Sequence, residues 1–92
     1  MSFSVYKYQL KIDDVVEINL PLGAKILRVD VQGKMSVCLW ALVDVSEVKT
    51  EKHAIRIAGT GHPISEDREI RYINTFTMMD GALWFHAFEI EV

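Results

Sequence analysis

The sequence predicts an all-β protein, a single small domain of about seven mostly antiparallel strands that form a barrel or a two-layer sandwich. The first observation is that apolar and polar residues alternate with a period of two in several segments, as in half-buried strands. The second is that no long segment carries the 3.6-residue period of an amphipathic helix. The third is the length of 92 residues, which leaves room for one core, so residues 1–92 are taken as one domain.

Seven segments are expected to be strands. They are residues 5–12, 16–20, 27–32, 36–45, 53–58, 70–79 and 82–91. The first three alternate strictly, with apolar residues at every second position, and the third is expected to end in a hairpin turn at Gly33-Lys34. The fourth is apolar on both faces, as is typical of a central strand. The polar interval 44–52 that follows is expected to be a wide loop or one helical turn.

The second half of the chain carries the same kinds of signal. The fifth strand places Ile55 and Ile57 on one face. The last two strands flank Asp80-Gly81, which predicts a hairpin with a type I′ turn because that turn needs positive φ at both positions. The last strand is apolar or aromatic on both faces, so one face packs in the core. The other needs a further cover, which is a second layer, a neighbouring subunit or a flat ligand stacked on the indole of Trp84. Trp40, in the central strand, is expected to be largely buried.

Composition excludes several classes of protein. Half of the residues are hydrophobic and 25% are charged, which excludes a disordered chain. The net charge of −3 argues against duplex nucleic acid as a partner, because phosphate binding needs a basic excess. Cys38 is the only cysteine, so no intramolecular disulfide is expected, and Cys38 is interpreted as a small core residue.

Location and self-association follow from the distribution of apolar residues. The first residues lack the basic and apolar blocks of a signal peptide, and the apolar run that contains residues 39–43 is far shorter than the roughly 20 residues of a membrane span. We therefore expect a soluble cytoplasmic protein without membrane association. Apolar residues on both faces of the fourth and seventh strands predict a homo-oligomer, a dimer or higher.

No pattern in the chain predicts catalysis, a metal site or a cofactor. The three histidines and Cys38 lie far apart, without the short ligand spacing of zinc sites. The sequence contains neither a Gly-x-Ser-x-Gly elbow nor a His-x-Thr/Ser pair. We expect a protein that is not an enzyme, whose histidines are surface residues or hydrogen-bonded interior residues.

The most unusual segment is Gly-Thr-Gly-His-Pro at residues 59–63. Two glycines around a hydroxyl residue let the backbone turn sharply and point N–H groups outward, as in anion sites. The alternative is a β-bulge or a tight bend at a sheet corner. A small phosphorylated nucleotide would contact this segment, with an arginine on its phosphate and Trp40 or a histidine near its base. The candidate ligand-binding residues are Gly59, Thr60, Gly61, His62, Arg71, Trp40 and His86.

Five segments, at residues 6–10, 23–27, 39–44, 59–64 and 81–89, together resemble an uncharacterised family of proteins of similar length from tailed bacteriophages and prophages. The most distinctive are Gly-Thr-Gly-His-Pro-Ile at 59–64 and Phe-His-x-Phe-Glu at 85–89. The likeness covers residues 5–89. Trp84 is bulkier than the aliphatic residue associated with its position, so the resemblance assigns Trp84 no ligand role.

The resemblance implies a context, the cytoplasm of an infected bacterial host, and no mechanism. Small acidic phage proteins without catalytic motifs often interfere with the host. In that context, the excess of apolar surface and the Gly-Thr-Gly-His-Pro loop suit a non-enzymatic anti-defence binder that sequesters a nucleotide-type immune signal, which is the function we expect. The alternatives are a protein-binding inhibitor of a host defence factor, acting through a strand edge or an apolar or acidic patch, and a structural or accessory phage protein.

Overall fold

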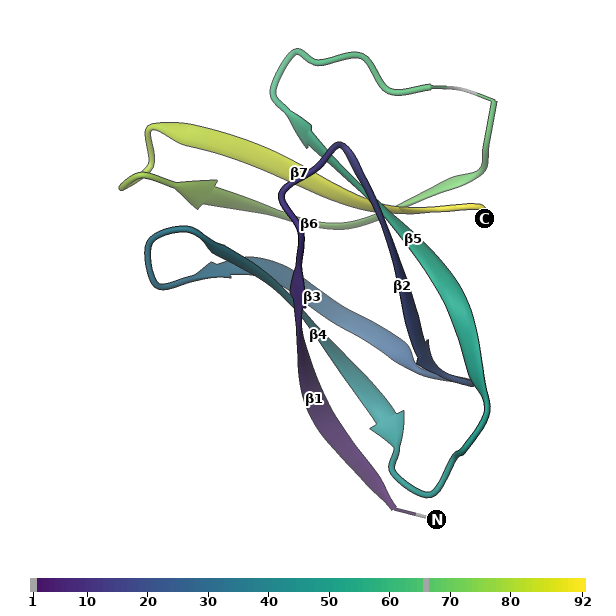
Figure 1. Cartoon of the computed structure of the whole chain (residues 1–92). Helices are drawn as coiled ribbons and strands as arrows, with labels where there is room; N and C mark the ends of the chain where they lie inside the picture. The colour runs from purple at the N-terminus through teal and green to yellow at the C-terminus, as the bar shows by residue number, and fades with distance from the viewer. Residues whose placement is uncertain (1, 66) are drawn as a thin grey trace.

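The computed structural model describes residues 2–65 and 67–92 of the chain. This part of the chain folds into seven strands (Figure 1). They are β1 (Phe3–Leu10), β2 (Val15–Pro21), β3 (Lys25–Gln32), β4 (Ser36–Asp44), β5 (Thr50–Gly59), β6 (Ile70–Met78) and β7 (Leu83–Ile90). Each strand matches one of the expected segments. No helix that could span a membrane occurs in the part of the chain that the structure describes.

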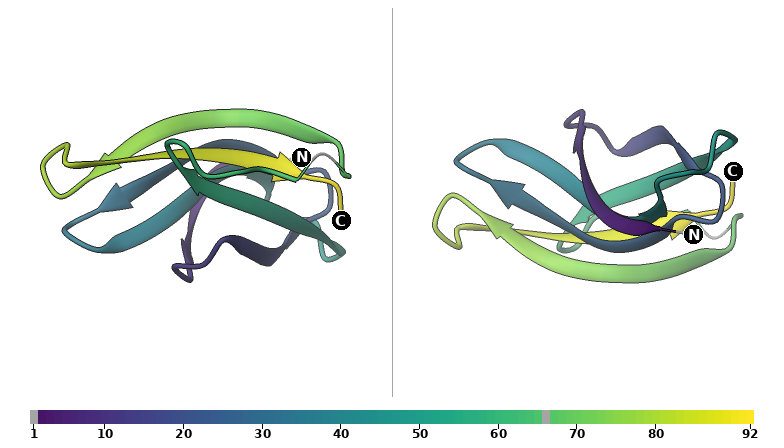
Figure 2. Two further views of the ribbon diagram at one scale, coloured as in Figure 1. Left: turned by 90° about the horizontal axis from the view of Figure 1, so that it is seen from above. Right: turned by 90° about the horizontal axis from the view of Figure 1, so that it is seen from below.

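The strands form two antiparallel sheets. Sheet A has the order β1-β4-β3, and sheet B has the order β2-β5-β7-β6. The two sheets face one another as layers (Figure 2). The prediction of an all-β fold is confirmed in its sandwich form, and the described strands do not close into a barrel. β4, the segment apolar on both faces, is the central strand of sheet A, as predicted.

The hydrophobic core lies between the two sheets. Both sheets supply it, because alternate residues of each strand point inward. The largest fully buried side chains are Leu20, Val29, Leu39, Val43 and Ile55. Burial of each contributes about 1.5–3 kcal/mol of hydrophobic stabilisation.

Trp40, expected to be largely buried, has intermediate exposure and is not part of the core cluster between the sheets. The strand register places Trp40 on the outer face of sheet A, opposite Lys7 on β1 and Arg28 on β3, and its side chain is only partly buried. Cys38 is on the same face but only 3% exposed. The Nζ of Lys7 donates to Oε1 of Gln32 at 2.6 Å. Because this bond joins β1 to β3 across β4, the lysine side chain passes over the central strand and helps to cover it.

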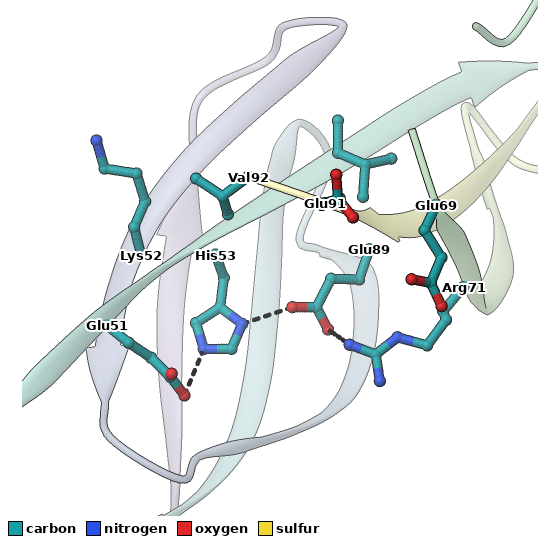
Figure 3. Close-up of a pocket in the computed structure, with 9 residues that line it drawn as sticks. Glu51, Lys52, His53, Glu69, Arg71, Glu89, Glu91 and Val92 are labelled. Atoms are coloured by element: carbon teal, nitrogen blue, oxygen red, sulfur yellow. Dashed lines mark hydrogen bonds and ion pairs between the residues drawn. The ribbon is translucent and has the colours of Figure 1, made fainter. Parts of the chain in front are cut away.

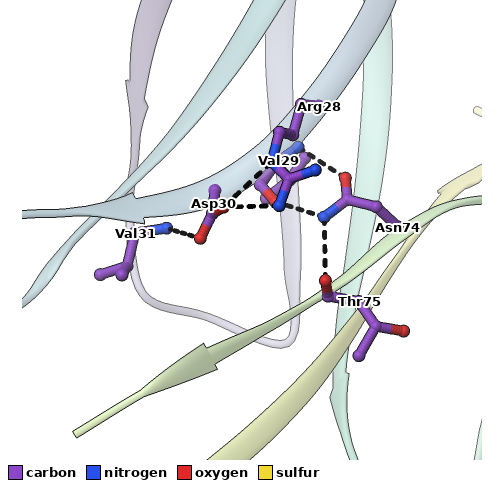
Figure 4. Close-up of polar contacts among 6 residues, drawn as sticks. All are labelled: Arg28, Val29, Asp30, Val31, Asn74 and Thr75. Atoms are coloured by element: carbon purple, nitrogen blue, oxygen red, sulfur yellow. Dashed lines mark hydrogen bonds and ion pairs between the residues drawn. The ribbon is translucent and has the colours of Figure 1, made fainter. Parts of the chain in front are cut away.

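One amide side chain joins the two sheets where β6 lies beside β3. Asn74 Oδ1 accepts from the backbone N–H of Val29 at 2.8 Å, and Asn74 Nδ2 donates to the Val29 carbonyl at 2.6 Å (Figure 4). The β6–β7 register shifts between Tyr72 and Asn74. This bulge turns Asn74 toward β3, since an extra residue in one strand re-aims the side chain that follows.

The hairpin turn predicted at Asp80-Gly81 is confirmed. Asp80 has φ 54° and Gly81 has φ 86°, and the Ala82 N–H donates to the Met79 carbonyl at 3.1 Å. These are the features of a type I′ turn. Met79 also has a positive φ, 54°, so pairing between β6 and β7 begins only at Met78 and Leu83.

The polar interval expected at residues 44–52 is a loop, one of the two expected forms, but only over 45–49, because β5 already begins at Thr50. Oδ1 of Asp44 accepts from the backbone N–H of Ser46 at 3.0 Å and from its hydroxyl at 2.7 Å. The Ser46 hydroxyl, followed by the Ser46 backbone N–H, holds the pKa of the Asp44 carboxyl below its usual value.

Candidate functional site

The Gly-Thr-Gly-His segment makes a sharp turn directly after β5. The His62 N–H donates to the Gly59 carbonyl at 3.0 Å, and Gly61 has φ 88°, which glycine adopts without strain. The Thr60 N–H donates to the Trp84 carbonyl at 3.3 Å, which ties the turn to β7. Two of the three N–H groups of residues 60–62 are therefore already bonded within the protein. In this conformation the turn offers its side chains to a ligand rather than a backbone anion cradle.

Close approach of a ring explains the other glycine of the segment. A Cβ built on Gly59 would lie 3.0 Å from Cε1 and 3.1 Å from Nδ1 of His62. The imidazole of His62 therefore packs directly on the backbone of β5, where any larger residue would displace it. The two glycines serve different purposes, one for a positive φ and one for space.

His86 holds the turn in place from the neighbouring strand. Its Nε2 lies 2.8 Å from the Thr60 hydroxyl, and its Nδ1 lies 2.9 Å from the Thr75 hydroxyl. The Tyr72 hydroxyl extends the chain of hydrogen bonds with a 2.8 Å contact to Thr75. A neutral imidazole donates through one ring nitrogen and accepts through the other, and a hydroxyl can do either, so both contacts are satisfied together.

A concavity of about 560 Å³ opens beside this turn. Its lining residues are Gly59, Thr60, His62, Ala82, Leu83, Trp84 and Phe85. The Trp84 side chain is 56% exposed, and its indole N–H donates to the Gly81 carbonyl at 3.1 Å. The ring is thus oriented by the β6–β7 turn while much of its surface is open to a ligand. We take this concavity as the candidate site.

The structure brings five of the seven sequence-predicted residues together. Gly59, Thr60, Gly61 and His62 form the turn, and His86 is bonded to Thr60. Trp40 and Arg71 lie elsewhere. Trp40 is on the outer face of sheet A, and Nη2 of Arg71 lies 3.4 Å from Oε1 of Glu89, in a separate recess. Neither can contact a ligand that occupies the concavity beside the turn.

Sequence reasoning did not include Trp84 among the site residues. The signal that identifies it is the pairing of β5 with β7, which sets Gly59 opposite Phe85, next to Trp84. A hairpin turn at Asp80-Gly81 fixes where β7 begins. Local alternation does not predict that β7 also pairs with β5, because this pairing joins residues far apart in the sequence.

A recess at the other end of sheet B contains the remaining histidine. His53 Nδ1 lies 2.6 Å from Oε2 of Glu89, and Nε2 lies 3.4 Å from Oε1 of Glu51 (Figure 3). Arg71 contacts the second oxygen of Glu89. Within residues 2–65 and 67–92, no group of three or more His, Cys, Asp or Glu residues could hold a metal ion.

Comparison with known proteins gives a family for the chain. Residues 1–92 match a family described as a domain of unknown function, DUF7352. No curated protein and no solved structure matches the chain. The expected membership of an uncharacterised family is confirmed at this level. Because the match covers every residue, the chain belongs to the DUF7352 family.

Proposed function

We propose that this protein is a non-enzymatic binder of a nucleobase-containing ligand, and that it acts in the cytoplasm of a bacterial host as a phage anti-defence protein that sequesters a nucleotide-type immune signal. One observation carries the binding proposal. The exposed indole of Trp84, the hydroxyl of Thr60 and the imidazole of His62 line one concavity next to a turn that β7 holds in place.

The size and chemistry of the concavity suit a base and its sugar. Its volume of about 560 Å³ is within the range of roughly 300–1,000 Å³ of small-molecule sites. Stacking of a base on an aromatic side chain is worth about 1–3 kcal/mol. Thr60 and His62 would contact polar edges of the base or the ribose hydroxyls, and the remaining lining is apolar.

The phosphate end of such a ligand would face solvent. His62 is the only titratable side chain among the lining residues of the concavity, and Arg71 is engaged with Glu89 in the recess. Affinity would therefore depend on the base more than on the number of phosphates. This supports recognition of a class of nucleotides rather than tight phosphate binding.

The lining also supports binding over catalysis. General acid–base chemistry needs a titratable group within hydrogen-bond reach of a second catalytic group or of the substrate. Both ring nitrogens of His86 face hydroxyl groups that occupy them. His62 is left as a lone donor or acceptor beside the apolar wall.

The proposal is tested by calorimetric titration with a panel of cyclic dinucleotides and ADP-ribose-type nucleotides. We expect the wild type to bind at least one of them, and Trp84→Leu to weaken binding by about tenfold or more because stacking is lost. Phe3→Leu is the matched control, since Phe3 is also exposed (60%) but lies on sheet A. Absence of binding across the panel, or equal binding by Trp84→Leu and Phe3→Leu, would refute the proposal.

A second candidate function is inhibition of a host defence protein by direct contact. The specific observation that favours it is the recess around His53. One hollow of this recess, of about 430 Å³, has four glutamates in its lining, Glu51, Glu69, Glu89 and Glu91, and two cationic side chains, Lys52 and Arg71. An acidic recess complements a basic protein segment rather than a nucleotide.

A further inference from the structure

A second recess lies at the far end of sheet B from the candidate site. It consists of two adjoining hollows of about 430 and 470 Å³ that share Glu51, His53, Arg71 and Glu89. These residues lie near the start of β5 and of β6 and near the end of β7 (Figure 3). The candidate site lies at the end of β5 and the start of β7, so the recess and the candidate site are separate.

The carboxylate of Glu89 is held by a histidine that is mostly shielded from solvent. Oε2 of Glu89 lies 2.6 Å from Nδ1 of His53, whose side chain is only 11% exposed. The other ring nitrogen, Nε2, is buried without a hydrogen-bond partner in the described part of the chain and faces Oε1 of Glu51 at 3.4 Å. A buried ring nitrogen without a partner is costly. Oε1 of Glu51 faces this nitrogen only as a long contact at 3.4 Å and forms no hydrogen bond with it, so a further polar group can bond there.

Arg71 occupies the recess only loosely. Its side chain is 73% exposed, and its Nη2 lies 3.4 Å from Oε1 of Glu89. An exposed ion pair of this length contributes little, because solvent screens it and the long side chain loses entropy. His53 holds the carboxylate of Glu89 in place, but the cation at its Oε1, the guanidinium of Arg71, is bound weakly. A second cationic side chain can therefore replace Arg71 there.

Charge and shape both point to an arginine. The first hollow has four carboxylates and only two cationic side chains, Lys52 and Arg71, in its lining. The second hollow adds Lys25 and an apolar wall of Ala24, Ile26 and Ile73. Over both hollows, four carboxylates therefore face three cationic side chains of lysine and arginine. An apolar wall that leads to carboxylates fits a side chain with an apolar stem and a charged head. A planar guanidinium can bond the carboxylates of Glu51 and Glu89 together, which a lysine ammonium does less well.

We propose that the recess binds an arginine side chain of a partner protein, and that Arg71 is an internal occupant which the partner's arginine displaces. The proposal does not depend on nucleotide binding. It gives the molecule a second recognition surface, suited to a basic protein segment, at the end of sheet B away from Trp84.

The test is an NMR titration of the full chain with the peptide acetyl-Gly-Gly-Arg-Gly-Gly-amide, compared with the same peptide carrying citrulline, a neutral isostere of arginine. We expect the arginine peptide to shift the amide signals of Glu89 and His53, and the citrulline peptide to bind about tenfold more weakly or worse. Equal binding of the two peptides would overturn recognition of a guanidinium. Free L-arginine that binds as tightly as the peptide would overturn the assignment to a protein segment.

Three variants separate the displacement from general charge effects. Glu89→Gln should lose about tenfold or more in affinity, because the acceptor carboxylate is gone. Arg71→Ala should bind the peptide several-fold more tightly, because the internal competitor is absent. Arg68→Ala is the matched control, an exposed arginine outside both hollows, and should change affinity far less than Arg71→Ala. If Arg71→Ala binds no more tightly than Arg68→Ala, Arg71 is not the displaced occupant.

Discussion

Asn74 on β6 and Val29 on β3 are joined by two hydrogen bonds that bridge the two sheets (Figure 4). The amide of Asn74 accepts from the Val29 N–H at 2.8 Å and donates to the Val29 carbonyl at 2.6 Å. A side chain thus takes the place of a peptide group from a neighbouring strand. Val29 has no exposed surface, so its backbone groups would have no water to replace these bonds.

Asn74→Ala should lower the free energy of unfolding by about 2–4 kcal/mol, because two buried backbone groups of Val29 lose their partners. The measurement is urea denaturation at equilibrium. Asn19→Ala is the control, since Asn19 is exposed on β2, and it should change stability by less than about 0.5 kcal/mol. Equal effects of the two substitutions would show that the bridge does not stabilise the sandwich.

Ser46→Ala should raise the pKa of Asp44. The Ser46 hydroxyl is the main reason that this pKa is low, followed by the Ser46 backbone N–H. A depressed carboxyl pKa contributes stability that is present at pH values above the ordinary pKa and is lost as pH falls through the lowered value. The wild type should therefore keep this contribution to a lower pH than Ser46→Ala. NMR titration of the Asp44 carboxyl measures the pKa directly, and identical curves for the two proteins would contradict the account.

Gly59→Ala and Gly61→Ala should fail in different ways. At Gly59 a methyl group would meet the His62 ring at 3.0 Å, so the ring must move and ligand binding should weaken. At Gly61 nothing lies within 4 Å of the added methyl, but the φ of 88° costs a non-glycine residue about 1 kcal/mol. Denaturation curves and the NMR signals of the His62 ring distinguish the two. A His62 ring that keeps its environment in Gly59→Ala would contradict the packing described.

Self-association through sheet A is expected, because β1 is an edge strand with Phe3, Val5 and Tyr6 exposed. Light scattering at micromolar concentration should give a multiple of the 10.5 kDa chain mass. Val5→Lys should shift the mass toward the monomer, since a charge on the edge strand opposes pairing. A wild-type mass near that of one chain would refute the expectation.

Local patterns in the sequence were enough to predict the strands and the turns. Alternation with a period of two identifies strands because one face of each is buried, and Asp80-Gly81 identifies its turn because both residues take positive φ. The pairing of strands was not predictable in the same way. β2 follows β1 in sequence but belongs to the other sheet, which is a consequence of packing of the whole chain.

The site was predictable only in part for the same reason. The Gly-Thr-Gly-His turn is a local signal, and its glycines do what that signal implies. Trp40 was expected near a ligand. It lies in a strand that is apolar on both faces, so the sequence pattern does not show which face points inward. The pairing of Trp40 with Lys7 of β1 and Arg28 of β3 places it on the outer face. The contact of His53 with Glu89 joins residues 36 positions apart, and no spacing rule anticipates such a pair.

The central claim, that a nucleobase stacks on Trp84, is tested most directly by fluorescence. A Trp40→Phe variant has Trp84 as its only tryptophan, and Trp84 is 56% exposed. Titration of this variant with the nucleotide panel should quench the Trp84 emission in a saturable way, with the midpoint that calorimetry gives for the same ligand. Emission that stays constant while calorimetry records binding would place the ligand elsewhere and contradict the account.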